Sequence, residues 1–139
     1  MPPIRVLTYQ ESEGDVPLHT WLREVGTGNR DAAARCRDLI QRLADHGHAL
    51  RRPSSAPLRD EIHELRARVG RVNYRVLYFF NGRGVAVLTS GCTKASEVDD
   101  ADIDRAVRYR DEFRADSDRH AYRPPRPKLT TPPRKGQTR

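Results

Sequence analysis

The sequence predicts an α+β fold with the element order β-α-α-β-β-β-α, in which the helices pack on one face of a mainly antiparallel four-stranded sheet. Residues 61–94 contain three runs with apolar residues at every second position, separated by turn signals, which is typical of a strand meander. Residues 15–47 and 99–115 instead carry apolar residues three and four positions apart, which is typical of helices with one buried side.

The N-terminal part of the chain predicts one strand followed by two helices. Residues 4–9 alternate weakly and indicate the strand. Pro17 favours the first turn of a helix, where its missing N–H costs no hydrogen bond, and Gly26 and Gly28 end that helix. Asn29 is a good N-cap for the second helix, and Gly47 suits the position after its last turn. Residues 48–59 are expected to be a connection.

A hairpin follows, because Gly70-Arg71 is a plausible two-residue turn between strands at 62–69 and 72–80. This turn pairs apolar residues on one face, including Leu65 with Val76, and places Arg66 opposite Arg75 on the other face. A register shifted by one residue would turn the arginines toward the core, so the alternation itself selects this pairing.

A second turn, at residues 81–84, leads into a third strand. The expected pairing places Phe80 opposite Val85 and Arg75 opposite Ser90. Side chains alternate along a strand, so Leu88, Ser90, Cys92 and Lys94 are expected on the Arg75 face. Arg66, Arg75 and Lys94 would then converge on one open or concave surface that also carries Glu64.

The chain ends in a predicted helix at 99–115, opened by Asp99 or Asp100, and a tail at 116–139. The tail holds five prolines and seven Lys or Arg residues against two Asp, so we expect a domain at 1–115 and a disordered or loosely extended tail. A basic arm that is attracted to RNA or to an acidic partner and a nonspecific solubilising tail are both compatible with this composition.

The overall composition excludes several classes of protein. The 139 residues carry a net charge of +7, most of it in the tail, and contain no apolar run long enough for a transmembrane helix. The N-terminus lacks the layout of a signal peptide, so we expect a cytoplasmic protein without a membrane partner. Cys36 and Cys92 have no metal-motif spacing and are expected to be reduced thiols.

The meander and last helix resemble the RelE/ParE toxin superfamily, in its HigB-like, phage Gp49-like branch. The matching pieces are Glu64-Leu65-Arg66, the run from Tyr74 to Phe80, a glycine turn, an apolar strand ending at Gly91, Lys94, and a helix containing Ile103 and Ala106. The chain departs from the family at three places. It has Cys92 where an aromatic residue is common, Ala95 where a second lysine is common, and Asp99-Asp100 where Thr-Pro often opens the last helix.

The resemblance implies the toxin of a type II toxin–antitoxin pair, which cuts mRNA in the ribosomal A site and needs no metal or other cofactor. The implied partners are a helix-turn-helix antitoxin of the HigA-like kind, the ribosome and mRNA. In the implied reaction a ribose 2′-OH attacks the adjacent phosphate. The planar, always-charged fork of arginine suits stabilisation of the crowded, dianionic phosphorane.

On this basis the candidate catalytic residues are Arg66, Arg75 and Lys94. The two arginines would bind the phosphate and its transition state. Lys94 would be a third ligand, or a base if neighbouring cations lower its pKa. The candidate substrate-binding residues lie on the same face; they are Glu64, Arg68, Asn73 and Ser90. Among them, Glu64 is expected chiefly to neutralise and orient an arginine. Tyr74, Tyr78 and His63 fall on the core face and are expected to pack there.

Other interpretations of this face stay open. In one alternative to a binding site, Glu64, Asp60 or Glu61 neutralises Arg66 and Arg75 within the fold. In another, the side chains of both arginines extend into water. The same fold also serves ParE-like toxins, which inhibit DNA gyrase without cleaving RNA. A non-enzymatic, phage-type protein that binds RNA or a protein partner is the third interpretation, and fold alone does not choose among them.

Overall fold

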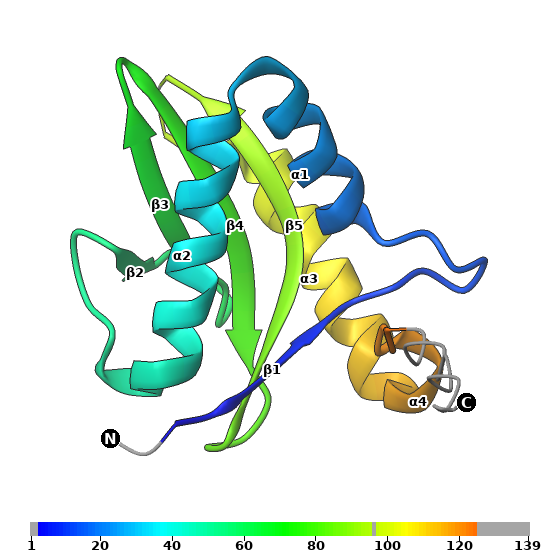
Figure 1. The fold of residues 1–139 in the computed structure, drawn as a ribbon. Coiled ribbons are helices and arrows are strands. Elements are labelled where there is room, and N and C mark those ends of the chain that lie inside the picture. The colour runs from blue at the N-terminus through cyan, green and yellow to red at the C-terminus, as the bar shows by residue number, and fades with distance from the viewer. Residues whose placement is uncertain (1–2, 96, 125–139) are drawn as a thin grey trace, which may run out of the picture.

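The computed structural model describes residues 3–95 and 97–124, and its centre is a five-stranded sheet in the order β1-β5-β4-β3-β2 (Figure 1). Only β1 and β5 pair in parallel. The elements in chain order are β1 (Arg5–Thr8), α1 (Pro17–Gly28), α2 (Arg30–His46), the 3₁₀ turn η1 (Gly47–Ala49), β2 (Ser55–Pro57), β3 (His63–Val69), β4 (Val72–Phe80), β5 (Val85–Lys94), α3 (Asp100–Ala115) and α4 (Ser117–His120). The α+β class and the order of the predicted elements are confirmed, and β2 is an additional strand.

The two N-terminal helices begin and end where their capping residues indicate. Pro17 is the first residue of α1. The side chain of Asn29 accepts a hydrogen bond from the Ala32 N–H at 3.0 Å, which satisfies one of the free donors at the start of α2. Gly47 ends α2 with a positive φ of 54°, a conformation that side chains rarely adopt.

The β3–β4 hairpin has the predicted register. Arg66 lies opposite Arg75, Leu65 opposite Val76 and His63 opposite Tyr78. The two-residue turn at Gly70-Arg71 and the alternation of apolar residues determine this pairing together.

The predicted β4–β5 register is wrong, because one residue more than expected separates the paired residues at the turn and because β5 contains a bulge. Phe80 lies opposite Ala86 and not Val85, and Arg75 lies opposite Cys92 and not Ser90. Between these pairs the register shifts at Leu77/Tyr78, which leaves Thr89 as the extra residue on β5. The Thr89 hydroxyl donates a hydrogen bond to the Leu77 carbonyl at 3.0 Å. The longer turn places Leu88 on the Tyr78 face, away from the Arg75 face where it was expected, and the bulge then returns Ser90 and Cys92 to the Arg75 face.

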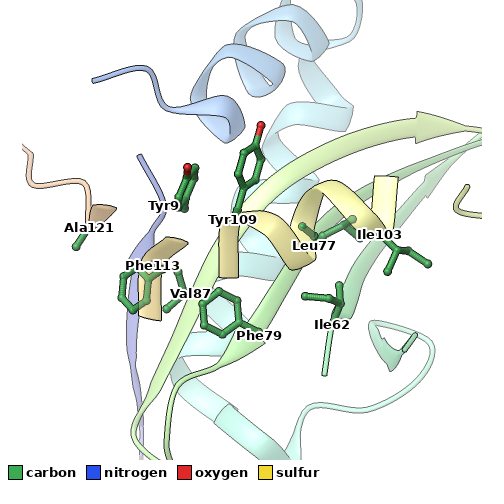
Figure 2. Close-up of a cluster of buried hydrophobic side chains, with 10 residues drawn as sticks. Tyr9, Ile62, Leu77, Phe79, Val87, Ile103, Tyr109, Phe113 and Ala121 are labelled. Atoms are coloured by element: carbon green, nitrogen blue, oxygen red, sulfur yellow. The ribbon is translucent and has the colours of Figure 1, made fainter. Parts of the chain in front are cut away.

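Helices cover both faces of the sheet, so the prediction that they pack on one face is wrong (Figure 1). Leu18 from α1 and Leu39 and Leu43 from α2 pack against β3, β4 and β5 on the first face. On the second face, α3 packs across Leu77, Phe79 and Val87, through Ile103, Ala106, Tyr109 and Phe113 (Figure 2). Leu77 and Phe79 follow Arg75 on the same side of β4, so this face is apolar at one end and charged at the other.

The chain beyond residue 115 continues to pack on the domain, so the predicted boundary at 115 is too early. Tyr9 and Ala121 form a β-bridge, and the Tyr122 N–H donates to the Thr8 carbonyl at 2.8 Å. His120 and Ala121 are buried. Disorder is predicted for residues 116–139, and of these residues 125–139 lie outside the described residues.

Within residues 3–95 and 97–124, no helix combines the length and hydrophobicity that a membrane-spanning segment needs.

We predict that Gly91→Ala destabilises the fold, because α1 packs directly on Gly91. A Cβ at this position would lie 2.1 Å from Trp21 Cδ2, and the Trp21 indole is held in place by a 3.0 Å hydrogen bond to the Thr93 hydroxyl. We expect a loss of about 1–3 kcal/mol in the free energy of unfolding, the usual cost of overpacking. Urea unfolding measures it. Gly84→Ala is the control, because a Cβ there meets nothing within 4 Å, and equal midpoints for the two variants would contradict the prediction.

Candidate functional site

The charged end of the second sheet face carries a compact group of ionisable side chains from three strands and one helix. We call it the charged cluster; its members are Glu64 and Arg66 from β3, Arg75 from β4, Cys92 and Lys94 from β5, and Asp102 from α3. Cys92 lies directly opposite Arg75, and charges on Arg75, Lys94, Glu64 and Asp102 all act on its thiol. The structure therefore brings together all three predicted catalytic residues and Glu64.

A buried carboxylate neutralises the arginine pair. Glu64 and Arg75 are 4% and 3% exposed, and Glu64 Oε1 lies 2.7 Å from Arg75 Nε. The other carboxylate oxygen of Glu64, Oε2, lies 3.6 Å from Arg66 Nη1. Two arginines directly opposite each other repel, and the shared carboxylate offsets that repulsion. The interpretation that Glu64 neutralises the pair internally is thus correct. The two other acids considered are engaged elsewhere, Asp60 with Arg59 and Glu61 with Arg110 and Arg114.

Lys94 is held by two carboxylates and not by neighbouring cations. Its Nζ lies 2.7 Å from Asp99 Oδ2 and 3.6 Å from Asp102 Oδ2. The hydrogen bond to Asp99, together with the negative charge of Asp102, raises the pKa of Lys94 above its ordinary value. The condition for a role as a base, a pKa lowered by neighbouring cations, is therefore not met, and the role as a third phosphate ligand stays a prediction. Lys94 is a permanent cation at neutral pH, and it ties the end of β5 to the start of α3.

The remaining predicted substrate-binding residues lie around the charged cluster. Arg68 is exposed and lies opposite Asn73, which is buried and in turn lies opposite Lys94. Ser90 is buried opposite Leu77, with its hydroxyl 3.3 Å from that of Thr89. The longer turn and the bulge together place Cys92 opposite Arg75, so Ser90 does not occupy the position on which its predicted role depended.

A pocket of about 400 Å³ opens beside the cluster, and we call it the arginine pocket. Its walls come from β2, β3, β4 and the segment that enters α3, and include Glu64, Arg66, Arg75, Ala56, Pro57, Glu97, Val98, Asp100 and Ile103. Lys94, Arg68, Asn73 and Ser90 are not part of these walls. Of the residues predicted from the sequence, Arg66, Arg75 and Glu64 are therefore the ones that meet at a cavity.

The arginine pocket contains two further arginines that sequence reasoning missed. Arg59 is fully engaged, with Asp60 at 2.6 Å, Asp104 at 2.7 Å and Asp100 at 3.2 Å. Arg52 is exposed, and it takes part in none of the ion pairs found within residues 3–95 and 97–124. The adjacent arginines Arg51 and Arg52 were the sequence feature that could have indicated a cationic site here. They lie in residues 48–59, which were expected to form only a connection.

This geometry suits the binding of a phosphate group. Arg75 is buried and oriented by Glu64, Arg66 has a side chain that is 31% exposed, and Arg52 is exposed at the rim. Guanidinium groups bind phosphate oxygens through two parallel N–H donors, and charge-assisted bonds of this kind are stronger than neutral ones. The arrangement thus pairs one rigid cation with two accessible ones.

A group of three acidic side chains lies away from the arginine pocket. The carboxylates of Glu11, Glu13 and Asp15, in the loop before α1, lie within 4.8 Å of one another. None of the three lines the arginine pocket, and exposed acidic groups often cluster without a metal.

Comparison with known proteins assigns a family to most of this structure. A family model described as Phage derived protein Gp49-like (DUF891) matches residues 21–111. The matched segment runs from α1 into α3 and includes every member of the charged cluster. No curated protein matches the chain.

We predict that Arg75→Ala destabilises the fold far more than Arg66→Ala. Removing Arg75 leaves Glu64 buried with only Arg66 at 3.6 Å, and breaking a buried ion pair from one side costs about 3–5 kcal/mol. Arg66 is partly exposed, so its removal is expected to cost about 0–1 kcal/mol. Chemical denaturation of the two matched variants measures the difference, and equal stabilities would show that the Glu64–Arg75 pair is not structural.

We also predict that both thiols of the folded protein resist alkylation. Burial is the main cause that raises the pKa of Cys36 and of Cys92 to about 11, so the reactive thiolate is scarce at pH 8. Mass spectrometry after iodoacetamide treatment at pH 8 should find no label on the folded chain and two labels after unfolding. Rapid labelling of Cys92 in the folded chain would instead show that the charged cluster stabilises a thiolate.

Proposed function

The chain belongs to the Gp49-like family of RelE/HigB-like toxins, and from this premise we propose that it is the toxin of a type II toxin–antitoxin pair that cleaves mRNA on the ribosome. The observation that carries the nuclease proposal is the arginine pocket. Arg66 and Arg75 project from adjacent strands into one cavity of about 400 Å³, at whose rim Arg52 stays accessible. Fold and family alone do not specify a reaction, so the proposal depends on this site.

In the proposed reaction the ribose 2′ oxygen forms a bond to the adjacent phosphorus, and the bond from phosphorus to the 5′ oxygen breaks. The products are a 2′,3′-cyclic phosphate and a 5′-hydroxyl, and the proton lost by the 2′-OH is balanced by the proton gained by the leaving oxygen. Arg75, oriented by Glu64, and Arg66 would contact the phosphate oxygens as negative charge accumulates. The proposed reaction is metal-independent, because guanidinium groups supply the positive charge.

The proposed partners follow from the family and the reaction. A small helix-turn-helix antitoxin of the HigA-like kind would neutralise the toxin, and the substrate would be mRNA in the decoding site of the ribosome. A toxin that acts on translating ribosomes works in the cytoplasm, where we place the protein.

Arg66 is a better residue than Arg75 for testing the site. Arg75 is buried against Glu64, so loss of toxicity in Arg75→Ala would mix a chemical effect with a folding defect. Arg66 lines the same pocket but is partly exposed and only loosely paired. Arg83 is a matched control, because it is exposed in the turn between β4 and β5 and does not line the pocket.

We predict that Arg66→Ala reduces mRNA cleavage about a hundredfold or more, the usual loss when one group that stabilises a transition-state charge is removed. Wild type, Arg66→Ala and Arg83→Ala are induced in a bacterial host, and new mRNA 5′ ends are mapped with and without a block on translation initiation. Wild type and Arg83→Ala should produce cuts that vanish when translation stops, while Arg66→Ala should not cut.

Other outcomes would redirect the assignment. Full cleavage by a folded Arg66→Ala variant would refute the arginine pocket as the site of reaction. Growth arrest without cuts, accompanied by DNA damage signalling, would indicate a gyrase inhibitor of the ParE kind. Neither arrest nor cuts would favour a non-enzymatic protein that binds RNA or a protein partner.

A further inference from the structure

A second pocket, of about 630 Å³, adjoins the arginine pocket across the edge strand β2. The two pockets share Arg52, Ala56 and Pro57, but they open on opposite faces of the sheet. Arg66 and Arg75 lie on one face, and His63, Tyr78 and Phe80, which line the second pocket, lie on the other. We call this second cavity the aromatic pocket.

Flat rings dominate the wall of the aromatic pocket. His48 stacks on Phe80 with ring centroids 3.8 Å apart, and His63 meets Phe80 nearly edge-on, at 76° and 5.2 Å. His63 also stacks on Tyr78 at 5.3 Å. Tyr78 is buried, but His48 is exposed and His63 and Phe80 are only partly buried, so the corner formed by these rings faces the cavity. Such a corner offers one face for stacking and one edge for contact with a planar ligand.

The polar groups of the aromatic pocket favour a nucleotide over an apolar ligand. Arg51 and Arg52 line it together with Ser55, and its lining contains no acidic residue. Burial, together with the nearby His48, lowers the pKa of His63, so its ring stays neutral at pH 7 with one donor and one acceptor nitrogen. Rings that carry hydrogen-bonding edges, beside arginines in a lining without acidic residues, are a combination with which proteins hold unstacked bases of RNA.

We propose that the aromatic pocket binds one unstacked base of a single-stranded RNA whose neighbouring phosphate occupies the arginine pocket. The base would stack in the corner of His63 and Phe80, and Arg52 would contact the backbone where it crosses β2. The inference rests on the proposed function, because it takes RNA as the ligand of the arginine pocket. It adds a base-binding subsite on the far side of the sheet edge.

The five histidines of the chain allow this proposal to be tested on the intact protein. Proton and carbon NMR signals of the histidine rings are followed while the full chain is titrated with each nucleoside 5′-monophosphate, and in parallel with ribose 5-phosphate. We expect at least one nucleotide to shift His48 and His63 but not His19, His46 or His120, which do not line the pocket. Ribose 5-phosphate, which lacks a base, should not shift them.

The nucleotide affinity of a Phe80 variant gives the second measurement. Phe80→Leu keeps an apolar side chain but removes the stacking surface, and we expect it to weaken nucleotide binding about tenfold, in line with the usual contribution of one base–aromatic stack. Far-UV circular dichroism checks that the variant is folded. If it unfolds, His48→Ala, at an exposed ring of the same pocket, replaces it.

Three results would overturn the inference. Absence of His48 and His63 shifts with all four nucleotides at millimolar concentration would exclude a base-binding site, and equal shifts with ribose 5-phosphate would show that the pocket recognises only phosphate. Unchanged affinity in folded Phe80→Leu would exclude the stacking. RNA cleavage is measured separately, so a protein that shows base-dependent shifts but does not cut mRNA would refute the nuclease proposal alone.

Discussion

The buried contact between Glu64 and Arg75 is the interaction on which the site depends. Two arginines face each other across β3 and β4, and a sheet retains such a pair only when a negative charge offsets their repulsion. Glu64 supplies that charge to both, at 2.7 Å from Arg75 and 3.6 Å from Arg66. The difference between these distances gives the arginines different properties. Arg75 is fixed within the fold, whereas Arg66 keeps its guanidinium accessible to a ligand.

The position of α3 decides how much of the charged sheet face remains available. The helix packs on Leu77, Phe79 and Val87 at one end of this face and leaves the arginine end beside its own N-terminus. Lys94 joins the two parts through Asp99 and Asp102, and this contact changes its chemistry. A lysine among arginines would lose its proton more easily, but between carboxylates it retains it. Lys94, predicted as a third phosphate ligand or a conditional base, thus also holds the end of β5 to the start of α3.

The short strand β2 gives the molecule an edge with a pocket on either side. Pairing of Ser55 with Leu65 brings the preceding residues against β3, so that Arg52 reaches both cavities. One cavity offers guanidinium groups and the other offers rings, and a nucleotide carries both a phosphate and a base. This correspondence between the two cavities and the two parts of one ligand unites the nuclease proposal with the base-binding inference.

The sequence by itself determined the α+β class, the β3–β4 register and the helix caps, because each depends on local chemistry: a two-residue turn, alternating side chains, or one capping residue. It also placed Arg66, Arg75 and Glu64 on one face. Only the tertiary structure decided the β4–β5 register, since the extra residue at the turn and the bulge at Thr89 both keep the alternation within each part of β5 and so leave little trace in the pattern. Tertiary packing likewise placed α3 on the second face and Arg52 in the site, because these depend on contacts between segments distant in sequence.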